Sequence, residues 1–207
     1  MSKTQAKIEL KNIELKNIHK AYGEKTVLKD FNLAITGSEI TVIMGTSGAG
    51  KTTLLRLIAG LETPDRGTVT GAPEAKSMLF QEDRLCEQLS AAENVSLALK
   101  PKNKKERKAV LSNIEKHFQR TGLDLSHHET SPVRELSGGM KRRVALVRAM
   151  MADSELILLD EPCKGLDEAT KELTLKYIKE ERRGRTMIVV THDADEASFF
   201  DGKIISL

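Results

Sequence analysis

The chain has 207 residues, of which 39% are hydrophobic and 30% charged, and its formal net charge is +3. This length and composition indicate one globular domain with a buried core, and so small a net charge does not indicate a nucleic-acid partner. No apolar run has the length of a membrane span, and residues 1–20 are polar and lysine-rich, unlike a signal peptide. Cys86 and Cys163 lack metal-ligand spacing, so we expect two reduced thiols in a cytosolic protein.

The N-terminal part predicts an antiparallel β-layer. Residues 8–12 and 13–17 form a near-repeat of alternating apolar and polar side chains, and residues 27–35 alternate in the same way after a turn at 23–25. Two units are too few for a repeat protein, so one copy could be an extra lead-in. Tyr22 lies just before the turn, where it could stack on a base or pack as an ordinary strand-end side chain, and its position favours neither.

A phosphate-binding loop follows the next expected strand, residues 40–44, and leads into an apolar helix over 52–59. It fits the pattern G-x-x-x-x-G-K-[ST] with Gly45, Thr46, Ser47, Gly48, Ala49, Gly50, Lys51, Thr52 and Thr53. The glycines let backbone N–H groups turn toward phosphate oxygens, and the helix N-terminus adds its positive dipole end. Lys51 brings a full positive charge and Thr52 a hydroxyl for Mg²⁺. The alternative, a glycine-rich turn with an incidental lysine, does not account for the complete motif between a strand and a helix.

After the loop helix, residues 63–67 predict a turn and residues 77–80 a short strand that ends at Gln81. No strand pattern occurs from residue 84 to 152, so we expect a helical region there. Its helices are expected over residues 90–99, 104–120 and 136–151.

Several charged and polar groups of this helical region are expected at the surface. The basic run within residues 100–108 is interpreted as a solvated helix face, with contact to a partner or to anionic lipid as the alternative. The histidines have no carboxylate or cysteine partners for a metal site; they are His117, His127 and His128. In the last helix the basic side chains are expected on other faces than the apolar stripe of Met140, Val144, Val147 and Met151; they are Lys141, Arg142, Arg143 and Arg148.

The C-terminal part alternates strands and helices. Strands are expected over residues 156–159, 187–190 and 203–207, with a helix over 168–179 between the first two and a short helix before the last. Such alternation on both sides of a helical insertion predicts a mostly parallel sheet, in which ligands bind beyond the carboxyl ends of the strands. The phosphate loop and the side chains that follow other strands meet at those ends; these side chains are Gln81, Asp160, Glu161 and His192.

These side chains suit a nucleoside triphosphate with Mg²⁺. Asp160, Thr52 and Gln81 supply oxygen atoms for the metal, and Glu161 is suited to polarise the attacking water. His192 can hydrogen-bond a γ-phosphate oxygen, and Gln81 can contact the water as well. Each side chain alone has an ordinary alternative, such as a solvated acidic pair at a strand end.

A second anion site is expected where Ser137, Gly138 and Gly139 open a helix. The alternative is an ordinary helix N-cap, which a serine provides regardless of function. Because the phosphate loop already serves one nucleotide, the second site suggests closure over a nucleotide held by another subunit.

Taken together, the sequence resembles the ATP-binding-cassette (ABC) ATPases from about residue 13 to 207. The phosphate loop matches the Walker A motif, and LSGGM at 136–140 matches the family's own signature. The remaining matches are the Q-loop at Gln81, Walker B with its catalytic glutamate at 156–162, the end of the D-loop at Asp167 and the switch histidine at His192. Tyr22 falls where the family has its adenine-stacking aromatic residue, which now favours that interpretation.

The resemblance implies an α/β fold with a phosphate-loop NTPase (RecA-like) core, an N-terminal antiparallel β-layer and an inserted helical subdomain. We expect one domain over residues 1–207, in which 1–82 and 153–207 form the β-layer and core and 83–152 the helical subdomain. It also implies a head-to-tail dimer that encloses two ATP molecules with Mg²⁺, with Asp167 at the interface. ATP hydrolysis would then power transmembrane permease subunits from the inner face of the cell membrane.

Two short segments resemble bacterial importer ATPases for nitrate, sulfonate or taurine: QEDRL at 81–85 and the residues at 161–167. Such importers imply an extracytoplasmic solute-binding protein. Cys163 departs from this group, where we expect a bulky residue, a tryptophan after the Q-loop is absent, and no C-terminal regulatory domain is expected. A soluble ABC ATPase acting in an assembly process is the alternative, whereas Glu161 and His192 disfavour a module that binds nucleotide without hydrolysis.

Overall fold

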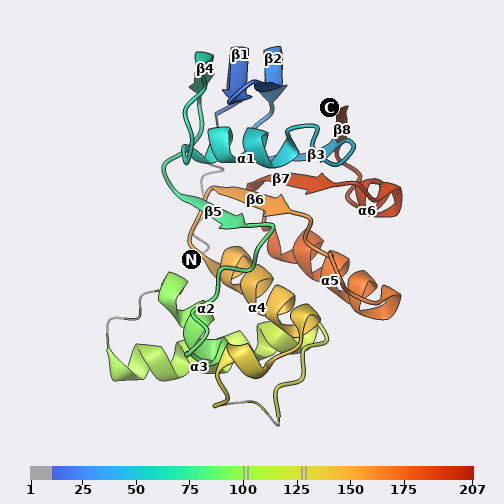
Figure 1. Cartoon of the computed structure of the whole chain (residues 1–207). Coiled ribbons are helices and arrows are strands. Elements are labelled where there is room, and N and C mark those ends of the chain that lie inside the picture. The colour runs from blue at the N-terminus through green and yellow to red at the C-terminus, as the bar shows by residue number, and fades with distance from the viewer. Residues whose placement is uncertain (1–10, 100, 102, 127, 129) are drawn as a thin grey trace, which may run out of the picture.

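The structure is a computed structural model that describes residues 11–99, 101, 103–126, 128 and 130–207. It is built in layers, which follow one another from top to bottom in Figure 1. A three-stranded antiparallel sheet, helix α1 (Lys51–Ala59) and a five-stranded parallel sheet lie above helices α4 (Gly138–Met151) and α5 (Glu168–Glu181). Helices α2 (Ala91–Leu99) and α3 (Lys104–Arg120) lie at the far end, beyond α4. This arrangement confirms the predicted fold class.

The antiparallel sheet has the strand order β2-β1-β4. Strand β1 (Ile13–Tyr22) begins at the second copy of the near-repeat, and β2 (Lys25–Ile35) follows the expected turn. The first copy falls mostly outside the described residues, and its last two, 11 and 12, are not in a strand. The interpretation of residues 63–67 as a turn only was wrong, because β4 (Arg66–Thr70) begins there and pairs with β1. With Val69 as its one apolar residue, β4 forms through this pairing rather than through a local pattern.

The parallel sheet has the strand order β5-β6-β7-β3-β8, and every neighbouring pair is parallel. Its strands are β3 (Ile40–Met44), β5 (Lys76–Leu79), β6 (Leu156–Asp160), β7 (Thr186–Thr191) and β8 (Lys203–Ser206). The carboxyl ends of parallel strands lie at one edge of a sheet, so the segments that follow β3, β5, β6 and β7 share that edge.

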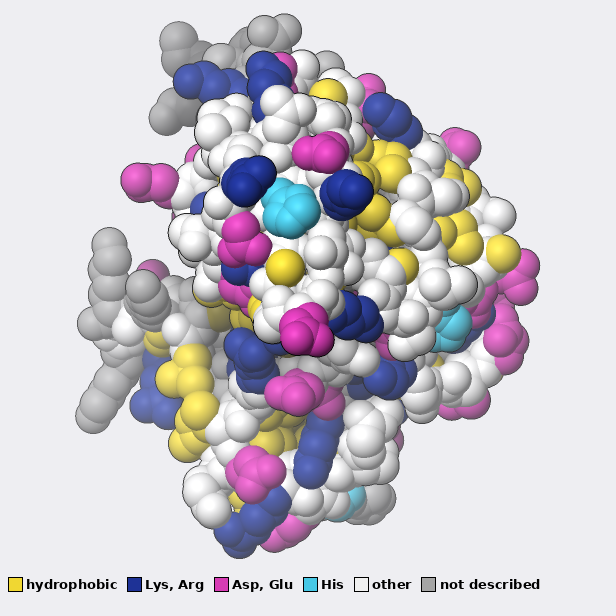
Figure 2. Space-filling view, turned by 45° about the horizontal axis from the view of Figure 1, so that its top comes forward, with side chains coloured by type: hydrophobic (Ala, Val, Ile, Leu, Met, Phe, Trp, Pro, Cys, Tyr) yellow, Lys and Arg dark blue, Asp and Glu magenta, His cyan; other side chains and the backbone are white. Residues whose placement is uncertain are grey.

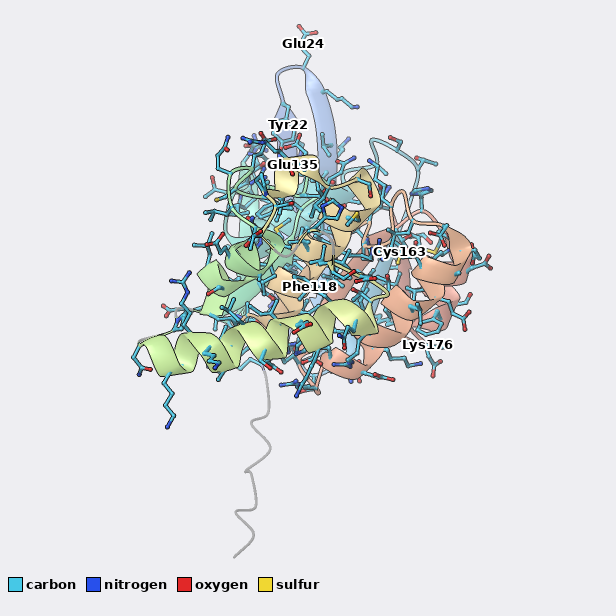
Figure 3. All side chains as sticks on the ribbon, turned by 90° about the horizontal axis from the view of Figure 1, so that it is seen from below. Tyr22, Glu24, Phe118, Glu135, Cys163 and Lys176 are labelled. Atoms are coloured by element: carbon cyan, nitrogen blue, oxygen red, sulfur yellow. The ribbon has the colours of Figure 1, made fainter. Side chains whose placement is uncertain are left out.

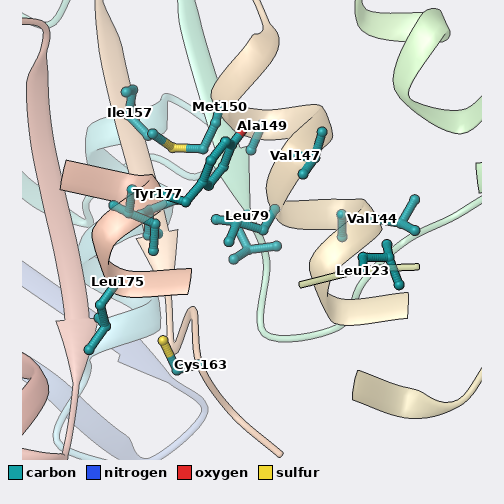
Figure 4. Packing of buried hydrophobic residues seen from close by; sticks show 14 of the residues in the cluster. Leu79, Leu123, Val144, Val147, Ala149, Met150, Ile157, Cys163, Leu175 and Tyr177 are labelled. Carbon is teal, nitrogen blue, oxygen red and sulfur yellow. The ribbon is translucent and has the colours of Figure 1, made fainter. Parts of the chain in front are cut away.

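Apolar clusters cover both faces of the parallel sheet. Strands β6 and β7 are buried at every position, as their continuous apolar sequences predict. Figure 4 shows Tyr177 of α5 among side chains of α4 and β6, including Met150 and Ile157. Both cysteines are free thiols; Cys86 is exposed, whereas burial holds the pKa of Cys163 far above its usual range.

The surface prediction for His117 was wrong, because α5 covers the face of α3 that carries it. His117 is 4% exposed, and its Nδ1 lies 3.0 Å from the Tyr177 hydroxyl oxygen. Arg120 on the same helix donates to Glu181 of α5 at 2.7 Å. Burial is the main cause that lowers the pKa of His117, which favours the neutral ring. His127 lies outside the described residues, and His128 is half-buried.

Charges of both signs are interspersed over the face of the molecule in Figure 2. In the basic run, Lys105, Arg107 and Lys108 are exposed, as expected of a solvated helix face, and Lys100 and Lys102 lie outside the described residues. Figure 3 shows α3 along one side of the molecule, and at the other end the β1–β2 hairpin projects with Glu24 at its tip. None of the helices in the described ranges has the length and hydropathy needed to cross a membrane.

Candidate nucleotide-binding site

The phosphate loop has the backbone shape that its glycines permit. Gly48 and Gly50 have φ of 83° and 98°, in the left-handed region that favours glycine. A Cβ on Gly50 would lie 2.7 Å from Cγ1 of Val27, so β2 also leaves no room for a side chain there. Gly50 is the residue before α1, and the free N–H groups of this helix start therefore face the loop.

Lys51 and Thr52 follow directly, in the first turn of α1. Lys51 is 8% exposed, and its ammonium group donates to the carbonyl oxygens of Gly45 at 2.7 Å and Thr46 at 2.8 Å. The Thr52 hydroxyl donates to Oδ2 of Asp160 at 2.8 Å, joining the loop to the end of β6. Asp160 is almost fully buried; burial is the main cause that raises its pKa, and the Glu161 carboxylate adds to the effect.

These residues line a pocket of about 320 Å³. The predicted site residues along it are Tyr22, Ser47, Gly48, Gly50, Lys51, Thr52, Thr53, Gln81, Asp160 and Glu161. Gly45, Thr46 and Ala49 belong to the same loop, and Ala49 donates its N–H to the Thr46 carbonyl oxygen at 3.2 Å. One wall of the pocket is therefore a cradle of N–H groups with a lysine, and the other carries carboxylate and amide oxygen atoms.

Glu161 lies where β6 ends, and its backbone has a φ of 49°, which is uncommon for a residue with a side chain. Its N–H donates to the Val190 carbonyl oxygen of β7 at 2.8 Å. One carboxylate oxygen lies 3.2 Å from Nδ1 of His192, and the other lies 3.7 Å from the Lys164 ammonium. The sheet edge thus brings the predicted water-polarising carboxylate together with the predicted switch histidine.

Tyr22 stands at the rim of the pocket and is 45% exposed. Its hydroxyl donates to the Glu62 carboxylate and lies 3.5 Å from the Thr53 hydroxyl oxygen. The ammonium of Lys20 lies 5.4 Å from the ring centroid. The ring is therefore held by its polar end while much of its surface stays open.

Ser137, Gly138, Gly139 and Asp167 are absent from the lining of this pocket. Ser137 caps α4 by accepting the N–H of Met140 at 3.3 Å, and Asp167 caps α5 by accepting that of Thr170 at 3.0 Å. Hydrogen bonds from Thr170 are the main cause that lowers the pKa of Asp167. A Cβ on Gly139 would lie 3.3 Å from Leu166, so the two segments are neighbours. Within one chain, Ser137 and Asp167 each serve as a helix cap.

Sequence reasoning missed two residues of β2 that line the pocket, Lys25 and Val27. It also gave Arg142 no role beyond a face other than the apolar stripe, whereas this side chain is 3% exposed. Arg142 points from α4 to the ends of β5 and β6. The sequence did contain one signal for this burial. Three consecutive cations at 141–143 point in directions that span more than half of a helical turn, so if other elements cover the helix on several sides, one of the three side chains must point inward.

A phosphate loop between a strand and a helix, with a buried carboxylate bonded to its threonine, defines a phosphate-loop nucleotide-binding domain. Comparison with known families then matches residues 28–164 to the ABC transporter family. The chain belongs to this family.

Curated relatives include the maltose/maltodextrin import ATP-binding protein MalK of Salmonella typhimurium, which is 38% identical over 95% of this chain. MalK of Escherichia coli K12 is 39% identical over 95% of the chain. The chain spans 56% and 55% of the length of these two relatives.

Solved structures agree with this assignment. A dimeric structure of MJ0796, a bacterial ABC transporter cassette, has a TM-score of 0.82 and 33% identity, and the match covers 94% of both chains. A dimeric structure of the same cassette in a post-hydrolysis state, bound to ADP and Pi, has a TM-score of 0.80 and 33% identity, with 94% of both chains covered.

Proposed function

We propose that this chain is the ATP-hydrolysing, nucleotide-binding subunit of a membrane transporter, and that two copies close around ATP. The observation that carries the proposal is the division of the site residues. The phosphate loop, Gln81, Asp160 and Glu161 share one pocket, whereas the LSGGM segment lies outside its lining. A Cβ on Gly138 would meet no atom within 4 Å, so a phosphate group could come close to this backbone.

The residues of the pocket divide the chemistry. Backbone N–H groups of the loop and Lys51 bind the phosphates, and Tyr22 stacks on the adenine. Mg²⁺ fits the oxygen donors of Thr52, Asp160 and Gln81, and when bound it neutralises charge on the phosphates. Glu161 accepts a proton from the attacking water. His192 is hydrogen-bonded to Glu161, orients the Glu161 carboxylate and also contacts the γ-phosphate.

The proposed dimer is head to tail, so Ser137 and Gly139 of one copy contact the phosphates held by the other, and Asp167 lies at the interface. ATP favours closure because it binds the closed pair better than the open pair. A change from 1:99 to 99:1 in favour of the closed pair needs about 5.5 kcal/mol of differential binding. Hydrolysis removes those contacts and lets the pair reopen.

We propose a cytoplasmic protein on the inner face of a bacterial membrane, where the Q-loop and the helical subdomain contact permease subunits of an importer. The assignment of residues 83–152 as this subdomain and of 1–82 and 153–207 as the core is part of the proposal. Relatives named for maltose import support the import direction. The proposal of nitrate-, sulfonate- or taurine-like solutes as substrates rests on the segments at 81–85 and 161–167 alone. A solute-binding protein would complete the complex.

Purification of the tagged protein from mildly solubilised native membranes tests the transporter assignment. We expect a polytopic membrane protein at stoichiometric yield, identified by mass spectrometry, and ATP hydrolysis by the purified chain. If only soluble partners are recovered, the alternative of an ABC ATPase in a soluble assembly process replaces the importer. If the purified chain neither binds nor hydrolyses ATP, the ATPase assignment itself is wrong.

Replacement of Tyr22 by alanine is expected to weaken ATP binding by roughly 5- to 100-fold, since base–aromatic stacking contributes about 1–3 kcal/mol. Equilibrium dialysis with labelled ATP measures the change. Tyr22→Phe is the matched control, because it keeps the ring and loses the hydroxyl contacts to Glu62 and Thr53. Equal affinity of wild type and Tyr22→Ala would exclude Tyr22 as the stacking residue.

A further inference from the structure

We propose that Arg142 is a positioning residue that fixes Gln81 and Glu161 relative to the helix that begins at Ser137. The roles of Gln81 and Glu161 rest on the function proposed above, whereas the structural part of the inference stands on the contacts alone. Arg142 is 3% exposed, lies near the start of α4 and belongs to none of the motifs that the sequence matched.

One guanidinium group of Arg142 holds the ends of two strands. Its Nη1 donates to the Phe80 carbonyl oxygen at 2.6 Å and to the Asp83 carboxylate at 2.9 Å. Its Nη2 donates to the Glu161 carbonyl oxygen at 2.8 Å and also to that of Asp160. The planar fork of arginine suits such convergent acceptors, which a lysine could not bind together.

These bonds begin where the sheet ends. The paired residues of β5 and β6 end at Leu79 and Leu159, so Phe80 and Asp160 are not paired with each other in the ladder. Buried carbonyl groups need donors, and Arg142 provides them. It therefore continues the connection between the two strands past the last ladder pair, at the level of Gln81 and Glu161.

The held segments have backbones that need such support. Glu161 and Arg84 have φ of 49° and 46°, conformations that persist only when the surroundings hold them. Arg148, six residues further along α4, donates to the carbonyl oxygens of Asp83 at 2.8 Å and Arg84 at 2.9 Å. Helix α4 thus holds the exit of β5 with two arginines, and only Arg142 also reaches β6.

This arrangement gives the Ser137–Gly139 segment a short connection to the proposed hydrolytic groups. Ser137 caps α4, and Arg142 lies five residues later on the same helix. A shift of α4 that brings Ser137 to a nucleotide on a second copy therefore moves the donors that hold Phe80 and Glu161. Arg142 contacts none of the phosphate-loop residues in the described structure, so its effect is on turnover rather than on nucleotide binding.

Arg142→Met tests this, with Arg185→Met as the matched control. Arg185 also donates to several carbonyl groups, those of Met150, Ala152, Glu181 and Arg182, but it precedes β7, away from the pocket. We expect kcat for ATP to fall about 10²-fold in Arg142→Met, as for a displaced catalytic group, with KM nearly unchanged. Arg185→Met is expected to lower the thermal unfolding midpoint and to keep kcat.

Hydrogen–deuterium exchange without nucleotide gives a second readout that needs no activity. We expect amides of residues 81–84 and 161–165 to exchange at least about tenfold faster in Arg142→Met, and not in Arg185→Met. Unchanged exchange there, or an equal loss of kcat in both variants, overturns the proposal. A wild-type chain that does not hydrolyse ATP refutes the proposed function, while the exchange result still decides whether Arg142 holds these segments.

If Arg142→Met does not fold, two milder variants take its place. Asp83→Asn removes the one charged acceptor of Arg142 and keeps the backbone contacts, so kcat is expected to fall about 3- to 10-fold. Arg142→Lys keeps the charge without the fork and is expected to show a larger loss than Asp83→Asn. Wild-type kcat in both variants overturns the inference.

Discussion

Replacement of Glu161 by glutamine is expected to lower ATP turnover by about 10²–10⁴-fold, the usual contribution of general-base catalysis. Glutamine keeps the size of the side chain and can still meet His192, but it cannot accept the proton of the attacking water. ATP binding is expected to persist because the loop, Lys51 and Thr52 are unchanged. The variant should therefore accumulate as a closed dimer. Phosphate release measures the turnover, and gel filtration with ATP·Mg²⁺ measures the dimer.

The matched control is Glu172→Gln, which makes the same change at an exposed position of α5. Glu172 pairs only with Lys176 on its own helix among the described contacts, so turnover and oligomeric state should match the wild type. A Glu161→Gln protein with normal turnover and only monomer would remove the catalytic assignment of Glu161.

Replacement of Lys51 by alanine is expected to weaken ATP binding by about 10- to 100-fold, since a hydrogen bond to a charged group contributes about 1.5–3 kcal/mol. The Lys51 ammonium is held at the loop by the carbonyl oxygens of Gly45 and Thr46, so the positive charge is already at the phosphate site. Turnover at saturating ATP should fall as well, because the lysine also stabilises the charge of the transition state.

Calorimetric titration of ATP measures the loss, and Lys76→Ala is the matched control. Lys76 lies on β5 and donates to the Ala59 carbonyl oxygen at the opposite end of α1, so its removal takes away the same charge far from the loop. Equal affinities for the two variants would mean that Lys51 contributes nothing to phosphate binding.

The strand-end motifs were predictable because their chemistry and their positions agree. Thr52 and Asp160 are 108 positions apart in sequence, yet the parallel sheet predicts that loop and strand end meet, and their side chains lie 2.8 Å apart. Strands β6 and β7 were also predictable from the sequence, because burial on both faces requires a continuous run of apolar residues.

The features that the sequence did not predict depend on tertiary contacts, which leave no local pattern in the sequence. His117 is buried under α5, where Tyr177, 60 positions away, supplies its partner. Arg142 is polar, and polarity predicts an outward direction until the carbonyl groups at the ends of two distant strands are known. The contact of the Tyr22 hydroxyl with Glu62 depends in the same way on how the β-layer lies over α1.

The order of strands in the parallel sheet has a consequence for synthesis on the ribosome. Among the described residues, strand β3, which leads into the phosphate loop, pairs with β7 and β8 alone, although more than 140 residues separate it from β7. Both edges of β3 therefore stay unpaired until β7 and β8 have emerged, and such exposed apolar edges invite association with other chains. The flanking strands of β3 are therefore completed only after β7 and β8 have been synthesised, so we expect the parallel sheet to form late and slowly, as non-local pairing dictates.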